Sequence, residues 1–299
     1  MATTREIVKR RKSVSNIRKI TKTMEMIATA RFKKAHDRAV GARPYTEKIT
    51  QLVATLAAGA QDADDQTAKH PLLRLNTKSH CTVLLVLTSN RGLCGGYNSS
   101  VIRLALQQIQ ALTDDGQQLD LRISGKKGLA ALTYKGHIPS GSYTDFDDKT
   151  TYAAVEELAD EFINLYTKEE IDAVQVVYTR FVSSARHYAD LLNLLPLSGL
   201  GAEETEQEAP KTDISFYDFY PSVDKILEDL IPTMVRTRLF QCFTEAIVSE
   251  QVARMNAMKA ATDNAEQMIE ALTRQYNRAR QSQITGELLD ILGGAEALK

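Results

Sequence analysis

The sequence predicts an α/β protein in which a long antiparallel coiled coil, formed by the N- and C-terminal helices, accompanies a small α/β domain. Residues 4–57 contain one glycine, Gly41, and one proline, Pro44, among good helix formers. Beyond Pro221 a second helical pattern runs for about seventy residues. Between these segments, strand-like and helix-like runs alternate, as in domains built on a parallel sheet. We therefore predict an N-terminal coiled-coil helix, an α/β domain and a C-terminal coiled-coil helix, over residues 1–57, 72–198 and 213–299.

The N-terminal helix has the heptad pattern of a coiled coil, with a first row of contact residues and a companion row beside it. The first row is predicted to contain Ile7, Val14, Thr21, Ala28, Ala35, Ala42, Ile49 and Leu56. The companion row is predicted to contain Ile17, Met24, Tyr45 and Leu52, with interruptions at Arg10, Arg31 and Arg38. A helix of this length would measure about 80 Å at ~1.5 Å per residue.

The stretch "AAGAQDADDQTAKHP" at residues 57–71 has the composition of a linker. Strands are then predicted at "CTVLLVLT", "LDLRIS" and "IDAVQVVYTRFV", and helices over residues 98–113, 126–134 and 151–166. A further strand at "HYADLLNLLPL" follows its predecessor after a short connection, which suggests an antiparallel edge pair. The whole segment is predicted to be a Rossmann-like domain with a largely parallel sheet.

The C-terminal helix is predicted to follow an acidic loop, "GLGAEETEQEAPKT", and to end near Leu292. Pro232 should kink this helix or mark a break. Its contact row is predicted to contain Leu239, Phe243, Ala246, Ala253, Ala257, Ala260 and Met268, with interruptions at Glu250 and Asn264.

The two terminal helices most economically pair with each other. Alanine in both rows would let the helix axes approach to the short end of the usual range, ~8 to 10 Å. The C-terminal helix is the longer by some fifteen residues, or roughly 25 Å. One helix should therefore continue past the end of its partner.

Charge is segregated along the chain, although the net charge of the 299 residues is only −1. Residues 1–48 contain fourteen lysines and arginines against four acidic residues, a balance of +10. No apolar run approaches the ~18 residues that span a bilayer, and the N-terminus does not resemble a secretory signal, so we expect a cytosolic chain. The cysteines Cys81, Cys94 and Cys242 show no metal-ligand spacing, and we expect them to pack as reduced thiols.

A glycine-rich turn, "SNRGLCGGYN" at residues 89–98, follows the first strand and raises the question of nucleotide binding. Its glycines, Gly92, Gly95 and Gly96, have neither dinucleotide-fingerprint nor P-loop spacing, and no lysine follows them. The nearby "SGKKG" at residues 124–128 also indicates a structural turn. We expect no bound cofactor or metal. Arg91 could contact a partner's carboxylate or be an idle surface arginine.

No arrangement of residues typical of catalysis appears in the sequence. The histidines are scattered and a Gly-x-Ser-x-Gly motif is absent, so we expect no catalytic site in this chain.

Three motifs, in order along the chain, resemble the gamma-subunit family of F-type ATP synthases. They are "NIRKITKTMEMIATARFKKA", "SNRGLCGGYN" and "EQVARMNAMKAATDNAEQMIEALTRQYNRARQSQITGELLDILGG". The resemblance covers essentially the full length.

This resemblance implies a rotor shaft. Its partners would be the alpha and beta subunits of the catalytic ring, the epsilon subunit and the membrane c-ring, and nucleotides would bind to the ring and not to the shaft. Proton flow would turn the c-ring and the shaft with it. The chain would be a peripheral membrane protein on the cytoplasmic side of a bacterial inner membrane. The implied ring contacts are Lys22, Met24, Arg91, Arg280, Gln281 and Thr285.

Several alternatives stay open at this stage. Met24 could equally pack in the companion row, and Lys22 could be a solvated lysine. The resemblance also implies an apolar collar around Ile284 to Leu292, and the basic N-terminal helix could attract acidic segments of the beta subunits. Asn90 stands where the family often has aspartate, and the cysteine pair of chloroplast-type members is missing. The rival hypotheses are a nucleic-acid-binding coiled coil and a nucleotide-dependent enzyme.

Overall fold

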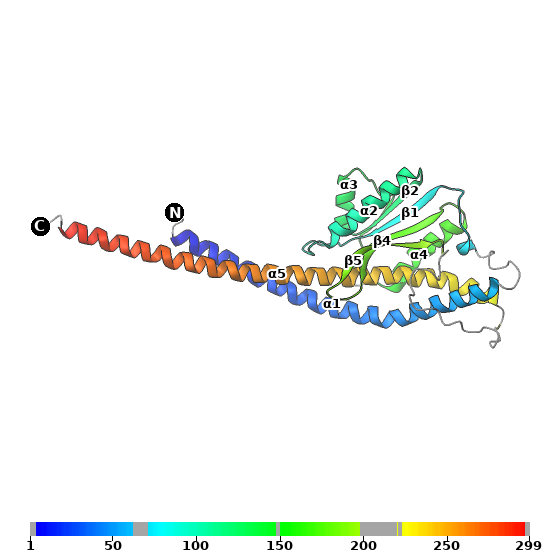
Figure 1. Cartoon of the computed structure of the whole chain (residues 1–299), viewed down its shortest axis with the longest axis horizontal. Coiled ribbons are helices and arrows are strands. Elements are labelled where there is room, and N and C mark those ends of the chain that lie inside the picture. The colour runs from blue at the N-terminus through cyan, green and yellow to red at the C-terminus, as the bar shows by residue number, and fades with distance from the viewer. Residues whose placement is uncertain (1–3, 62–70, 148–149, 198–219, 221–222, 297–299) are drawn as a thin grey trace. The chain divides into compact units, whose positions relative to one another are not determined.

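The computed structural model describes residues 4–61, 71–147, 150–197, 220 and 223–296. Two very long helices, α1 (Thr4–Gln61) and α5 (Val223–Glu296), stand at the two ends of the chain (Figure 1). Between them lie η2 (Pro71–Leu73), β1 (Cys81–Leu87), α2 (Tyr97–Asp114), β2 (Gln118–Ser124), α3 (Lys126–Tyr134), β3 (Gly141–Tyr143), α4 (Tyr152–Thr167), β4 (Ala173–Phe181) and β5 (His187–Leu195). The predicted α/β class with long terminal helices is confirmed.

The five strands form one sheet in the order β3-β2-β1-β4-β5. Strands β3, β2, β1 and β4 pair in parallel, and β5 pairs antiparallel with β4 at the edge. In the centre of the sheet Leu84 of β1 aligns with Leu121 of β2 and with Gln175 of β4. The largely parallel sheet and its antiparallel edge pair are both as predicted.

The chain divides into two compact units, and each is described by itself. The first contains residues 1–30 and 254–299, and the second contains residues 31–253. The first unit is therefore the helix pair, by which we mean residues 4–30 of α1 and 254–296 of α5. The second unit contains the sheet.

The sheet in the second unit is covered on both faces. Val83, Leu85 and Leu87 of β1 belong to a core shared with α4, with residues 49–56 of α1 and with residues 227–246 of α5. Leu84 and Val86 belong to a separate core under α2 and α3. Every residue from Val83 to Leu87 is buried, which explains why β1 is an unbroken apolar run and does not alternate with polar residues. Burial of each such side chain stabilises the fold by about 1.5–3 kcal/mol.

Arginines with acidic partners tie the elements of this unit together. Arg236 of α5 donates to Asp160 of α4 at 2.7 Å, and this hydrogen bond is the main reason that the pKa of Arg236 lies above its ordinary value. On the sheet, burial lowers the pKa of Arg122, but its hydrogen bonds to Asp120, Glu161 and Tyr143 outweigh that effect and raise it. Both arginines are therefore firmly charged partners in the packing of α4.

Three details differ from the sequence prediction or extend it. β3 has only three residues and was not predicted. α5 is continuous through Pro232, so the predicted alternative of a break is wrong. The acidic loop at 199–212, and most of the predicted linker, lie outside the described residues. In the described part of the chain, no helix combines the length and apolar character needed to cross a membrane.

The turn between β2 and α3 explains why two of its residues are glycines. Gly125 has φ +99°, and a Cβ atom there would lie 2.1 Å from the carbonyl oxygen of Thr88. At Gly128 a Cβ would lie 2.5 Å from the Thr88 hydroxyl, which accepts the Gly128 N–H at 3.0 Å. Close packing against the end of β1 therefore requires both glycines.

We predict that Gly125→Ala destabilises the α/β unit by about 3 kcal/mol, because it combines a strained φ with a backbone clash. Urea unfolding of the full chain, followed by circular dichroism, would measure the change. The matched control is Gly41→Ala in α1, where nothing lies within 4 Å of the added methyl group. That substitution should instead stabilise its helix by about 0.5–1 kcal/mol. Equal midpoints for Gly125→Ala and the unaltered chain would contradict the packing role.

Candidate functional site

The helix pair has a buried seam that follows the predicted heptad on α1. Ile7, Val14, Thr21 and Ala28 are all buried at seven-residue spacing. On α5 the buried residues of the pair include Met258, Thr262, Ala265 and Leu272, with Ile269, Tyr276 and Ala279 packed beside them. The two helices are antiparallel, since Thr4 hydrogen-bonds to Gln283 and Arg18 pairs with Glu266. The predicted coiled coil is therefore present in this unit.

The predicted companion row on α1 is wrong. Ile17, Met24, Tyr45 and Leu52 are all exposed, with Met24 at 37%. In the helix pair, the positions four residues after the first row are half-buried instead, at Arg11, Arg18 and Glu25.

Polar partners on α5 explain this placement. The Arg11 guanidinium lies 5.5 Å from the centre of the Tyr276 ring, and Arg18 Nη1 lies 3.2 Å from Glu266 Oε1. Long arginine stems can cover a seam while their charged ends stay in water. A search for charge and cation–π partners across an antiparallel pair could have found this row from the sequence.

The predicted row on α5 is not the contact row of the helix pair. Within the pair, Ala260 and Met268 are exposed and Ala257 is half-buried. The earlier members are buried in the second unit: Leu239, Phe243 and Ala246 in the core that includes the sheet, and Ala253 beside Cys94 and Tyr97. From Met258 onward, the buried row of α5 is displaced from the predicted row by about one residue toward the C-terminus. A straight α-helix drifts by about 20° per heptad, so a fixed row loses its contact face over a few heptads.

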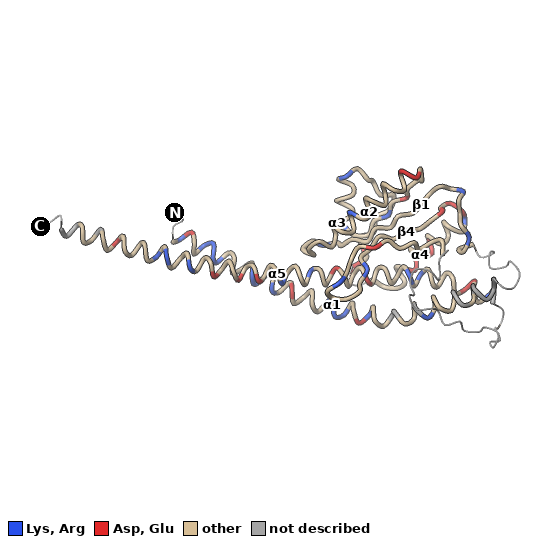
Figure 2. The backbone as a smooth tube through the Cα atoms, viewed as in Figure 1, with Lys and Arg blue, Asp and Glu red and all other residues tan. Residues whose placement is uncertain are grey.

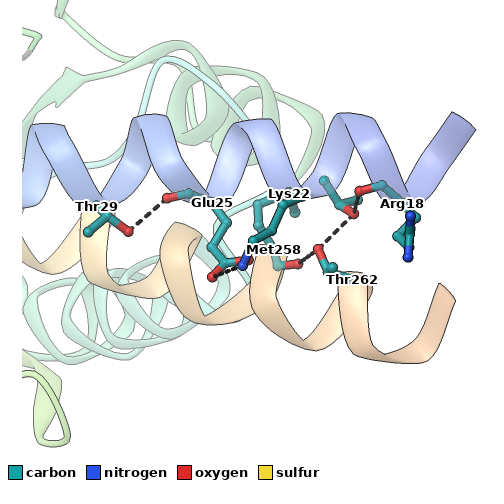
Figure 3. A network of polar contacts seen from close by, with 7 residues as sticks. Arg18, Lys22, Glu25, Thr29, Met258 and Thr262 are labelled. Atoms are coloured by element: carbon teal, nitrogen blue, oxygen red, sulfur yellow. Dashed lines mark hydrogen bonds and ion pairs between the residues drawn. The ribbon is translucent and has the colours of Figure 1, made fainter. Parts of the chain in front are cut away.

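The face of α1 that the seam does not use carries an apolar stripe. Ile17, Ile20, Met24 and Ile27 follow helical spacing and are all exposed. Lys22 lies on the same stretch, and its ammonium group is 3.1 Å from Glu25 Oε1 (Figure 3). Within the helix pair, this stripe is a surface on which another protein could pack.

The last part of α5 has no described partner. Thr4, the first described residue of α1, donates to Gln283 at 3.3 Å, and α5 continues for thirteen residues from Ile284 to Glu296 (Figure 1). At ~1.5 Å per residue this overhang is about 20 Å long. It exposes Ile284, Leu288, Leu289, Ile291 and Leu292.

The six implied contact residues do not form one cluster. Lys22 and Met24 are exposed on α1. Arg280 and Gln281 are exposed on α5 just before the overhang, and Thr285 is exposed within it. Thr262, which faces the Lys22 level of α1, is about 27 Å from Arg280 along the helix axis. Arg91 belongs to the other compact unit and is also exposed. Within the helix pair, the five implied contact residues therefore lie at two separate levels along the helices.

The glycine turn after β1 is closed by its own hydrogen bonds. Asn98 donates to the Ser89 hydroxyl at 2.8 Å and to the buried Cys94 sulfur at 3.2 Å. The Asn90 amide donates to the carbonyls of Thr144 and Phe146, and its oxygen accepts the Lys126 N–H. Asn90 thus joins two loops through donors that an aspartate lacks. In the described ranges, His, Cys, Asp and Glu do not gather into a group of three suited to a metal ion.

Comparison with known proteins gives consistent matches over the whole chain. A family model described as ATP synthase matches residues 3–298. The ATP synthase gamma chain of Rhodopirellula baltica is 47% identical, and that of Leptospira biflexa is 38% identical, each over 100% of both chains.

Solved structures show the same fold at lower identity. A chain in the Euglena gracilis mitochondrial ATP synthase (OSCP/F1/c-ring) has a TM-score of 0.65 at 20% identity, covering 99% of this chain and 94% of that one. A chain in the Tetrahymena thermophila central stalk/c-ring structure has a TM-score of 0.56 at 21% identity, covering 81% and 99%. Because the family model and the relatives span both terminal helices and the sheet, this chain belongs to the ATP synthase gamma chain family.

Proposed function

We propose that this chain is the central rotor shaft of an F-type ATP synthase. The observation that carries the proposal is the helix pair, a seam of two helices in which α5 continues past the first described residue of α1. It occurs in a chain with full-length membership of the gamma chain family. The shaft transmits rotation of the membrane c-ring to the catalytic ring of alpha and beta subunits. It does so for proton-driven ATP synthesis, or in reverse for ATP-driven proton pumping.

The proposed division of labour follows the predicted segments. Residues 1–57 and 213–299 form the shaft, and residues 72–198 form the foot that meets the epsilon subunit and the c-ring. The similar chains come from a central stalk/c-ring structure and an OSCP/F1/c-ring structure, which supports these partners. In this assignment the chain is a peripheral membrane protein on the cytoplasmic side of a bacterial inner membrane.

The chain contributes mechanics and no catalytic group of its own. Most backbone hydrogen bonds of a long helix are internal, so two helices packed along a seam resist bending and twisting. Nucleotides bind to the ring subunits. The close packing of Gly125 and Gly128 against Thr88 supports a structural role for the strand-to-helix turns.

The ring contacts are proposed to be Lys22, Met24, Arg91, Arg280, Gln281 and Thr285. Their exposure supports this assignment, because a contact residue must be reachable. For Met24, the neighbouring exposed residues Ile20 and Ile27 add an apolar surface around it. The overhang from Ile284 to Leu292 is proposed to turn inside an apolar collar at the end of the ring.

Copurification tests the rotor assignment. A tag inserted in the acidic loop at 199–212 should bring alpha, beta and epsilon subunits with the chain from a detergent extract of membranes. A strain in which this chain carries no tag is the control for non-specific capture. Recovery of the chain without these subunits, from an extract in which ATP hydrolysis is intact, would overturn the proposal.

The overhang generates a second prediction. Replacing both Leu288 and Leu292 by Gln should weaken binding of the shaft to the ring at least tenfold. The physical reason is that burying each leucine side chain in the ring contributes about 1.5–3 kcal/mol, which glutamine does not supply. Helix content of the isolated chain should not change, since both side chains are exposed in it. Glu287→Gln is the matched control on the same turn. Equal retention of the double variant and the control would exclude an apolar collar.

Charge on α1 generates a third prediction. Lysines and arginines recur along the N-terminal part of α1 (Figure 2), and Arg10 and Lys19 are exposed there. If acidic segments of the ring attract this surface, Arg10→Glu with Lys19→Glu should lower coupled turnover about two- to fivefold at low salt. The loss of turnover should be smaller at ~1 M salt, where the Debye length is only about 3 Å and the attraction is screened.

Arg11 and Arg18 are left unchanged in this test because they belong to the seam. The matched control replaces Arg10 and Lys19 by Gln, which removes charge without reversing it. Unchanged rotation torque in the reversed variant would show that this attraction does not contribute.

A further inference from the structure

The second compact unit contains a cavity where α1, α5 and the end of β4 meet (Figure 1). Its volume is about 130 Å³, and it is lined by both helices and by Phe181 and Val182. Val40 and Val182, which line it, are 55% and 51% exposed, so the cavity reaches the surface. An apolar cavity of ~150 Å³ accepts benzene, whereas drug-sized ligands need about 300 Å³ or more. This cavity therefore suits a molecule built on a single ring.

Much of the described lining is apolar and aromatic. Val40 lines the cavity from α1, Phe240 from α5 and Phe181 from β4. The Phe181 ring packs against two rings of α1, with its centroid 5.8 Å from that of His36 and 6.3 Å from that of Phe32. Such walls favour a flat apolar ring, which gains burial and ring-to-ring contact together. The apolar part of a ligand should therefore be aromatic.

The lining also contains a carboxylate, that of Glu245 on α5. Its Oε2 accepts the Phe181 N–H at 3.2 Å, and its Oε1 accepts a hydrogen bond from Gln241 Nε2 at 2.9 Å. These bonds hold the carboxylate in position, and a carboxylate can accept about four hydrogen bonds in all. An ammonium group can therefore bind to it while both of these bonds remain.

The sign of the charge selects between classes of ligand. Among the described residues that line the cavity, none is a lysine or an arginine. An anionic ligand would therefore meet the Glu245 carboxylate without a cation in the lining to offset it. A cationic ligand would gain a charge-assisted hydrogen bond, which is stronger than a bond between neutral groups.

We propose that this cavity binds a small aromatic ammonium compound, such as a primary arylalkylamine. The ring lies among Val40, Phe181 and Phe240, and the ammonium group donates to Glu245. Because Gln241 and the Phe181 N–H already position the carboxylate, little ordering is needed when the ligand binds. None of the proposed ring contacts lines the cavity, so the site does not depend on the rotor function.

Benzylammonium is a suitable probe, with benzyl alcohol as its neutral counterpart of similar shape. Ligand-observed NMR titration of the full-length chain, at pH 8 where histidine side chains are mostly uncharged, measures both affinities. We expect saturable binding of benzylammonium with a Kd of about 1 mM, and at least tenfold weaker binding of benzyl alcohol. Equal affinities would overturn the ammonium assignment. No saturation of benzylammonium binding below ~20 mM would overturn the site itself.

The variant Glu245→Gln tests the polar contact. It removes the charge but keeps an oxygen that can accept the Phe181 N–H. It should weaken benzylammonium binding about tenfold and leave benzyl alcohol binding unchanged. The matched control is Asp37→Asn, which removes the same charge from an exposed position of α1 outside the described lining. Equal losses in both variants would indicate a general charge effect and would overturn the Glu245 contact.

The variant Ala39→Leu tests the location, because Ala39 lines the cavity and a leucine there would fill it from α1. It should abolish binding of both probes with unchanged helix content by circular dichroism. Binding that persists in the folded variant would place the ligand elsewhere and would overturn the proposal. Should a variant fold poorly, the comparison of the two probes on the unaltered chain still decides between an ammonium site and none.

Thermal unfolding gives a second measurement on the unaltered chain. A ligand that binds only the folded chain raises its thermal midpoint. At about ten times its Kd, benzylammonium should raise the midpoint, and benzyl alcohol at the same concentration should raise it less. A midpoint that benzylammonium leaves unchanged would contradict binding to the folded cavity.

Discussion

The structure of the helix pair depends on one constraint, that a long helix cannot bury its own apolar row. Ile7 and Val14 of α1 are buried only because residues such as Leu272 of α5 cover them. A single partner helix of the same diameter covers only a narrow strip along each helix, and the rest of the helix surface stays in water. The exposed stripe that includes Ile17 and Ile20 follows directly from this geometry. A two-helix shaft therefore presents contact surface to its surroundings without any additional element.

Much of the fold could be predicted from the sequence because its periodic patterns are long. β1 is predictable because its apolar run is bounded by polar residues, and the terminal helices are predictable because they contain few helix-breaking residues. β3 has only three residues and one neighbouring strand, so it carries no pattern to detect. Pro232 removes the partner of the Glu228 carbonyl, but Glu228 is exposed and water can replace that bond, so the helix continues.

The site could be predicted less well than the fold, because one helix does not encode where its partner lies. Beside the first row of α1, the positions three and four residues later are equally adjacent. Apolar content favoured the wrong choice, with Ile17 and Met24. The true row is selected by α5, where Tyr276 and Glu266 receive Arg11 and Arg18. Such information is present only when both helices are considered together.

The overhang shows how an apolar surface can remain helical where the described residues give it no partner. Its thirteen residues are about as short as isolated helices that are marginal in water. The overhang, however, continues a helix that is already formed and held by α1, so it needs only propagation and no new nucleus. Leucine and isoleucine side chains can then remain exposed on an ordered surface, with Leu289 and Ile291 among them. A partner that packed on this surface would gain burial energy without first having to order the helix.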